Sequence, residues 1–330
     1  MSRHIIWIDN AKLLAMFLVL FEHHGLENRF VADWIWTFHL AAFFFISGLF
    51  ANSKSNFGVF LKNNFNRLII PVVLWHLIGS ISWQPALAYV MKPSEVLHSL
   101  LQTQMDFFAG RSCGFGWFMI CLFWMKCEFW VLHRVSSVLL YICGFILFPV
   151  TAYLIAGNAM LLPFYVINSM MSFPFYLLGY VLSDKVKCLQ MKPIYAGTLL
   201  LFSVVTSLLL CHIAGKYSLN ALEYGNYPAL IYIQGILGTS FVLILSYLIQ
   251  KDAPILRVLG GGTIVLLLLQ PPFLLISKVL YRIVARPQHP APYFDIFSAI
   301  LFSIIIMLLM VPIIKVIDKY VPMLNGHFKK

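Results

Sequence analysis

The chain has 330 residues, of which 61% are hydrophobic and only 11% are charged. Soluble domains carry roughly one-quarter charged residues, so this composition excludes an ordinary water-soluble protein. The formal net charge is +11, but the basic residues are spread over short segments instead of one polar face, which argues against nucleic acid as a partner. The composition predicts a protein of the lipid bilayer.

Apolar windows long enough to cross a bilayer recur along the whole chain. A spanning helix needs about 20 mostly apolar residues. Such windows fall at 5–23, 31–50, 68–90, 114–133, 135–156, 159–182, 194–214, 228–249, 258–281 and 294–317. These runs are too long and continuous for barrel strands, and helices pair their own backbone groups in lipid. We therefore expect an all-α bundle of about ten transmembrane helices, forming a single domain over residues 1–330.

The first window does not have the features of a cleaved signal peptide. Asp9 and Lys12 interrupt its apolar run, and Glu22 and His23 end it without a small-residue cleavage site. We expect this segment to remain as the first helix.

The distribution of Lys and Arg predicts the orientation of the bundle. An even number of spans puts both termini on one side, and cytoplasmic loops carry the excess of basic residues. With a cytoplasmic N-terminus, the fifteen inside are Arg3, Lys12, Lys54, Lys62, Arg67, Arg134, Lys185, Lys187, Lys192, Lys251, Arg257, Lys315, Lys319, Lys329 and Lys330. The seven outside are Arg29, Lys92, Arg111, Lys216, Lys278, Arg282 and Arg286, and Lys126 falls within a span. Both termini are therefore expected in the cytoplasm.

Ionisable groups are concentrated in the first predicted helix. Inside a span such groups cost several kcal/mol unless they are paired or hydrated, so each is a candidate functional residue. Lys12 and His23 are eleven residues apart, about three turns and about 16 Å along a helix, so both project from nearly the same face. Asp9 is placed to pair with Lys12. On spacing alone, a lysine that reaches the cytoplasmic surface and a histidine that marks the outer helix end explain the pattern equally well.

Several segments extend this pattern. WIDNAK at residues 7–12 is followed, after ten residues, by His23; FHLAAFFFISG lies at 38–48, FLKNNFNRLIIP at 60–71, and GWFM at 116–119. Together they resemble the membrane acyltransferase 3 family. The resemblance is clear over the first 120 residues and otherwise rests on the number and size of the helices.

The resemblance implies transfer of an acyl group, commonly acetyl, from a coenzyme A thioester to a hydroxyl of a carbohydrate or lipid-linked glycan. A basic residue, ten residues and a histidine form the family's functional signature, which Lys12 and His23 match. The expected partners are acyl-CoA, the glycan acceptor and membrane lipid, and the expected setting is polysaccharide biosynthesis at a bacterial inner membrane.

We predict His23 and Lys12 as the catalytic residues. A neutral histidine can accept the proton of a hydroxyl that attacks the thioester, and covalent transfer through an acyl-imidazole is the alternative. Lys12, Lys62 and Arg67 are expected to hold the anionic coenzyme, although positive-inside bias also explains Lys62 and Arg67. Further candidates for the substrate cavity are Asp9, Glu22, His24 and His39. The six cysteines show no CxxC pair or metal spacing, and no metal cofactor is expected.

Two positions depart from the family pattern. Asn63 stands four residues before Arg67, where the family often has a second basic residue, and Gln270 replaces a late histidine that precedes a proline. Neighbouring residues on a helix point about 100° apart, so Glu22 is not expected to pair directly with His23. Gly48 is interpreted as a helix-packing residue.

Three further features are less specific. Lys126 and Glu128 are expected to face the bundle or a nearby loop, and the glycines at 260–262 are expected to open the ninth span flexibly.

A secondary transporter or flippase for a glycan or small solute is the alternative function. The same intramembrane ionisable residues could form a substrate path, typically beside broken helices in paired positions of two halves. The break at residues 270–272, Gln-Pro-Pro, has no evident counterpart in the first half. The acceptor, the acyl chain and the oligomeric state stay open.

Overall fold

The computed structural model describes residues 5–88, 93–157, 162–285 and 293–328. In these ranges the regular secondary structure is helical, and the only β-type pairings are the isolated bridges of Leu26 with Phe294 and of Ser218 with Glu223. The predicted all-α class is therefore confirmed. Of the residues used to predict the orientation, Arg3, Lys92, Arg286, Lys329 and Lys330 lie outside the described ranges.

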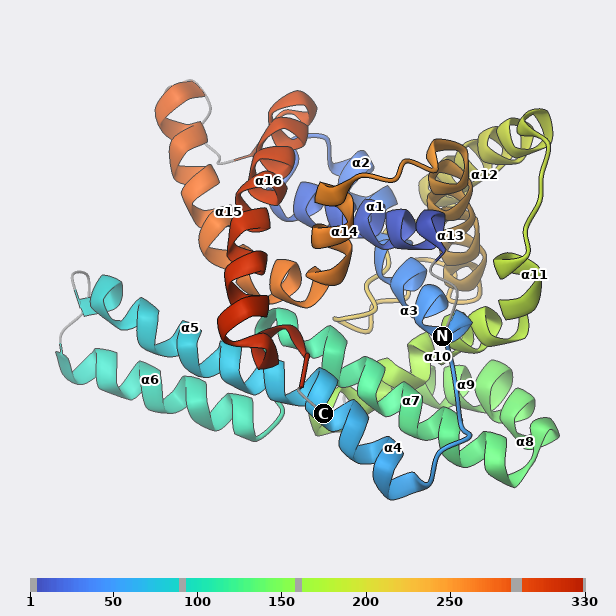
Figure 1. Cartoon of the computed structure of the whole chain (residues 1–330), viewed down its shortest axis with the longest axis horizontal. Coiled ribbons are helices and arrows are strands. Elements are labelled where there is room, and N and C mark those ends of the chain that lie inside the picture. The colour runs from blue at the N-terminus through green and yellow to red at the C-terminus, as the bar shows by residue number, and fades with distance from the viewer. Residues whose placement is uncertain (1–4, 89–92, 158–161, 286–292, 329–330) are drawn as a thin grey trace.

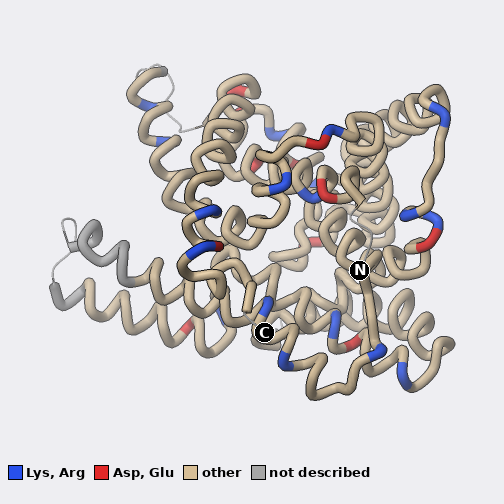
Figure 2. Tube along the Cα trace, viewed as in Figure 1, with Lys and Arg blue, Asp and Glu red and all other residues tan. Residues whose placement is uncertain are grey.

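The helices follow one another with short connections (Figure 1). They are α1 (Ile6–His23), α2 (Arg29–Trp36), α3 (His39–Leu49), α4 (Phe57–Asn64), α5 (Ile70–Ala88), α6 (Pro93–Phe108), α7 (Trp117–Val135), α8 (Ser137–Ile142), α9 (Phe148–Gly157), α10 (Val166–Val181), α11 (Ser183–Lys187), α12 (Pro193–Ala214), α13 (Leu230–Ile249), α14 (Pro254–Gly261), α15 (Thr263–Ala285) and α16 (Ile296–Tyr320). Shorter helical turns are η1 (Phe65–Ile69), η2 (Gly114–Gly116), η3 (Cys143–Leu147), η4 (Pro163–Tyr165) and η5 (Pro322–Asn325). Figure 2 shows how sparse the charged residues are along this trace.

Eight helical segments in the described ranges are long and apolar enough to cross a membrane. They are Arg29–Leu49, Gly114–Val135, Ser137–Ala156, Pro163–Val181, Pro193–Ala214, Leu230–Ile249, Thr263–Val284 and Ile296–Tyr320. Each corresponds to one predicted window. The windows 5–23 and 68–90 also form helices, α1 and α5, but these are not among the eight. The predicted total of about ten spans stays a prediction for these two.

Helix α1 lies inside the bundle. It packs against α3, α13, α14, α15 and α16, and its residues Ala11 and Ala15 are fully buried. Small side chains let membrane helices approach closely. The helix with the most ionisable groups is thus enclosed by other helices instead of facing lipid.

Two glycines allow α3 and α10 to meet at backbone distance. A Cβ on Gly48 would overlap the carbonyl of Tyr176, and a Cβ on Gly179 would overlap the carbonyl of Phe45. The predicted packing role of Gly48 is therefore confirmed. This contact fixes the end of α3, which contributes to the cavity described below.

The glycine run at 260–262 ends one helix instead of opening a span, so that prediction was wrong. Gly260 and Gly261 are the last residues of α14, and α15 begins at Thr263. A Cβ on Gly262 would crowd the side chain of Ile314, whereas nothing lies within 4 Å of a Cβ on Gly261. The missing side chain at Gly262 lets α16 close over the break between the two helices.

We predict that Gly48→Ala destabilises the protein, because the added methyl group meets a backbone carbonyl that cannot move without displacing α10. Overpacking of this kind costs about 1–3 kcal/mol or more. Thermal unfolding in detergent, followed by tryptophan fluorescence, measures the effect. Gly197→Ala is the matched control, because nothing lies within 4 Å of a Cβ there; equal melting temperatures for the two variants would contradict the packing role.

Candidate functional site

A cavity of about 540 Å³ lies beside α1. Its walls come from α1, α3, η1, α7, α14, α15 and the segment after α16. On α1 the lining runs from Ile5 to Val19, about 21 Å at the helical rise. Ile5 and His327, close to the two ends of the described chain, both line it. The two ends of the described chain therefore both lie beside this cavity, and the placement of both termini on one side of a membrane stays a prediction.

Three basic side chains line this cavity against one carboxylate. Lys12 and Asp9 form an ion pair with 2.9 Å between Nζ and Oδ1, as their spacing suggested. Arg67 and Lys126 make no hydrogen bond or ion pair with another residue in the described ranges. Arg67 is exposed and Lys126 is half-buried, so three positive charges against one negative charge line a site that water can reach. Such a surplus of positive charge attracts anionic ligands.

The π-helical turn η1 carries Arg67. The Nδ2 of Asn64 donates to the carbonyl of Phe60 at 2.8 Å, and η1 then winds more widely before α5 begins. A π turn inserts an extra residue into the winding and so redirects the side chains around it, often at functional sites. Arg67 and Lys62 are both exposed, but only Arg67 lines the cavity. The coenzyme-binding role of Lys62 stays a prediction.

Lys126 is the lining residue that the sequence did not assign to the site. Met119 and Leu122, seven and four residues earlier on α7, line the same cavity, which puts all three on one helix face. The available signal was a basic residue inside an apolar span. Sequence alone could not show which face of α7 points inward.

His23 lies one turn beyond the apolar end of the cavity. Its Nδ1 is 2.8 Å from the carbonyl oxygen of the lining residue Val19 and 2.8 Å from Oε2 of Glu22. Both neighbours are acceptors, so we assign the imidazole proton to Nδ1, which donates to the Val19 carbonyl and lies in close contact with the Glu22 carboxylate, and a lone pair to Nε2. The side chain is 25% exposed. A neutral His23 thus presents a basic nitrogen without a partner among the described residues.

The contact of Glu22 with His23 corrects the expectation that these neighbours would not pair. Their Cα–Cβ bonds diverge, but the glutamate side chain is long enough to fold back onto the imidazole. A histidine held by a carboxylate in this way has the orientation that a catalytic base requires.

A second cavity has a volume of about 550 Å³, and His23 is not among its lining residues. It is formed by α5, α6, η2 and α15, with aromatic surface and hydroxyl groups from Trp75, His76, Phe115, Ser80, Ser99 and Thr103. Within the described part of the chain, no Lys, Arg, Asp or Glu lines it. The ring centroid of Phe115 is 4.9 Å from that of His23. His23 therefore contacts one lining residue of each cavity, Val19 and Phe115.

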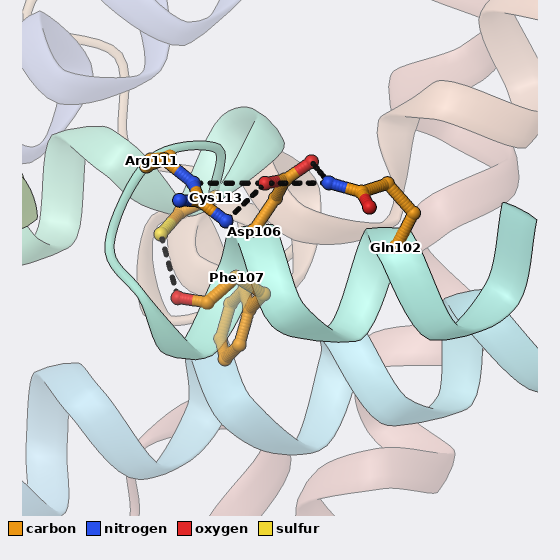
Figure 3. Close-up of polar contacts among 5 residues, drawn as sticks. All are labelled: Gln102, Asp106, Phe107, Arg111 and Cys113. Atoms are coloured by element: carbon orange, nitrogen blue, oxygen red, sulfur yellow. Dashed lines mark hydrogen bonds and ion pairs between the residues drawn. The ribbon is translucent and has the colours of Figure 1, made fainter.

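The segment before Phe115 is tied to the end of α6 (Figure 3). Asp106 accepts hydrogen bonds from Arg111 Nε at 2.9 Å and from Gln102 Nε2 at 3.1 Å. Gly110 turns the chain with a φ of 70°, a conformation that glycine adopts easily. These contacts hold the loop that positions Phe115 beside His23.

The remaining candidates line neither cavity. His24 is buried, with Nδ1 3.1 Å from the Oγ of Ser277 on α15. His39 is buried, and its Nδ1 lies 2.8 Å from the carbonyl oxygen of Ile35. Gln270, at the position of the family's late histidine, is fully buried, and neither atom of its amide group has a hydrogen-bond partner in the described ranges.

The helical bundle and its basic cavity define an integral membrane protein with a site for an anionic ligand. The family model of the acyltransferase domain, acyltransferase 3, matches residues 5–317, and the chain belongs to this family. The resemblance of the first 120 residues is thus confirmed over nearly the whole chain. No curated protein and no solved structure matches it. Membership makes the protein an acyltransferase, with an acyl donor and an acceptor, and favours this function over the transporter alternative.

In the described residues no group of three or more His, Cys, Asp or Glu could hold a metal ion. The six cysteines are free.

We predict that neutral His23 carries its proton on Nδ1. Nitrogen-15 NMR of histidine-labelled protein in lipid measures the tautomer, with the spectrum of His23→Gln subtracted for assignment. Glu22→Gln should lower the share of the Nδ1–H form, because it removes the charged acceptor. A predominant Nε2–H form in the unsubstituted protein would contradict the assignment of Nε2 as the basic nitrogen.

Proposed function

We propose that the protein is an O-acyltransferase that moves an acyl group, by expectation acetyl, from acyl-coenzyme A to a hydroxyl of a carbohydrate or lipid-linked glycan in a bacterial inner membrane. The supporting observation is the position of His23, which contacts a lining residue of a basic cavity and a lining residue of an uncharged one. A single basic nitrogen lies where substrates from two cavities would meet.

The basic cavity suits the donor. Lys12, Arg67 and Lys126 supply point-charge and fork contacts for phosphate groups. Beyond them, Met16 and Val19 give the cavity an apolar wall that suits an uncharged pantetheine arm. Lys12 and His23 are about 16 Å apart along α1, so an extended arm would bring the thioester from the phosphates toward the base.

The second cavity suits an uncharged acceptor. Aromatic walls with a few polar groups are typical of sites that bind small organic ligands. The hydroxyls of Ser80 and Thr103 donate to carbonyls of their own helices and can still accept a hydrogen bond, and the Ser99 hydroxyl also lines the cavity. Since no charged side chain lines this cavity in the described ranges, we assign it the sugar that carries the reacting hydroxyl.

In the proposed reaction, Nε2 of His23 accepts the proton as the acceptor oxygen attacks the thioester carbonyl carbon. The new C–O bond forms, the C–S bond breaks, and the leaving thiolate takes the proton back from the imidazolium. Glu22 stabilises that imidazolium and holds the ring, as the carboxylate does in catalytic triads. Attack by Nε2 itself, through an acyl-imidazole, is the covalent alternative.

The excess of basic residues in the loops on the side of the two termini supports a cytoplasmic position for the donor cavity. The acceptor would then enter from the opposite side, and the whole chain would act as one transmembrane domain.

We predict that His23→Ala abolishes transfer from radiolabelled acetyl-CoA to endogenous acceptors in membrane vesicles while donor binding is retained. Loss of a general base costs about 10²–10⁴-fold in rate, and Glu22→Gln should cost less, about tenfold. His98→Ala, at an exposed position of α6, is the control. If His23→Ala transfers the acetyl group at the rate of the unsubstituted protein, the proposed function is wrong.

We predict that Arg67→Ala and Lys126→Ala each weaken binding of acetyl-CoA about 10–100-fold, because each removes a charge-assisted contact to phosphate. Binding to purified protein in nanodiscs measures the change, with Lys315→Ala, exposed on α16, as the control. Lys62→Ala decides whether Lys62 contributes as well. Unchanged affinity in both Arg67→Ala and Lys126→Ala would contradict the assignment of the donor to this cavity.

A further inference from the structure

A cluster of aromatic and basic groups lies at the polar end of the donor cavity, beyond the residues that the proposed mechanism uses. Phe50, the residue that follows α3, lines the cavity and is 44% exposed. Two ammonium groups lie over its ring. The Nζ of Lys187 is 4.9 Å from the ring centroid, and the Nζ of Lys12 is 5.4 Å from it. Two like charges therefore lie close together over the Phe50 ring.

The two lysines differ in how their charge is compensated. Lys12 is paired with Asp9, whereas Lys187 donates only to a hydroxyl in the described ranges, the Oγ of Ser183 at 2.8 Å. A cation–π contact adds attraction for the ammonium, but it does not cancel the repulsion between two cations. An anion beside Lys187 would offset this repulsion.

Lys187 is held at this place by its own helix. The Oγ of Ser183 donates to the carbonyl of Leu49, the last residue of α3, at 2.9 Å. Helix α11 is thus bonded to the end of α3 directly before Phe50, and the same Ser183 hydroxyl receives the Lys187 ammonium. The ring and the ammonium form a fixed unit at the mouth of the cavity.

We propose that Phe50 and Lys187 bind the nucleotide end of coenzyme A, with the Lys187 ammonium on a phosphate and the exposed part of the Phe50 ring against the purine. This inference rests on the proposed function. In acyl-coenzyme A the nucleotide is the end farthest from the thioester, and Phe50 lies beside Lys12, which is about 16 Å from His23 along α1. Aromatic side chains bind bases through their π faces. Phe50 and Lys187 therefore select donors that carry a nucleotide over thioesters that lack one.

Competition binding tests this assignment. Radiolabelled acetyl-CoA bound to purified protein in nanodiscs is displaced by coenzyme A or by pantetheine, which lacks the nucleotide. Phe50→Leu keeps the apolar bulk and removes the aromatic face, and Lys187→Gln removes the charge. Each should lose about tenfold in affinity for coenzyme A, equivalent to one phosphate contact or one stacked base, and none for pantetheine. Lys185→Gln, exposed on the same helix, should lose nothing.

Equal losses for coenzyme A and pantetheine would overturn the inference, because the two side chains would then shape the whole cavity. Unchanged affinity for both ligands in both variants would overturn it as well. If the unsubstituted protein binds acetyl-CoA and both variants keep its preference for coenzyme A over pantetheine, only the assignment of the nucleotide to Phe50 and Lys187 fails. If the unsubstituted protein binds no acyl-CoA, the proposed donor is wrong as well as the nucleotide assignment.

Discussion

Charged groups cannot be held in the hydrocarbon of a membrane without a partner or access to water, and α1 carries Asp9, Lys12 and Glu22 along one apolar helix. The structure meets this constraint in two ways. Each carboxylate has a basic partner, Lys12 for Asp9 and His23 for Glu22, and the neighbouring helices enclose α1. The cavity beside Lys12 follows from the same constraint, because it lets polar ligands reach groups that lipid would exclude.

Enclosure of α1 also accounts for the arrangement of the two cavities. Its polar end lies beside Arg67 and Lys126, and its other end presents His23 between Val19 and Phe115. His23 lines neither cavity but contacts a lining residue of each, and a basic cavity beside an uncharged one suits a reaction between a charged donor and a neutral acceptor. In such an arrangement neither substrate needs to cross the hydrocarbon, because only the acyl group moves, from the donor to the acceptor beside His23.

Sequence predicted the fold better than the site. Apolar length alone located the eight helical segments that are long and apolar enough to span a membrane, because hydrophobic thickness is a one-dimensional property of the chain. The pairing of Lys12 with Asp9 also follows from local spacing. Lys126 could not be assigned, because which face of α7 points inward depends on its neighbours in space.

The missed features share one physical origin. The position of Arg67 depends on a π-helical turn, and the contact of Glu22 with His23 depends on side-chain rotamers. Both are three-dimensional properties that helical periodicity does not report. The second cavity combines segments more than 150 residues apart, such as Phe115 and Pro271. The GWFM segment and the break at 270–272 both contribute to it, but sequence alone did not show that they lie together.

The central claim is that one donor molecule extends from the basic residues to His23. A cryo-electron microscopy structure with a non-hydrolysable acetyl-CoA analogue tests it most directly. The proposed mechanism predicts phosphates beside Lys12, Arg67 and Lys126, with the acyl carbonyl next to Nε2 of His23. Density for the acyl group away from His23, or for the coenzyme in the uncharged cavity, would contradict it.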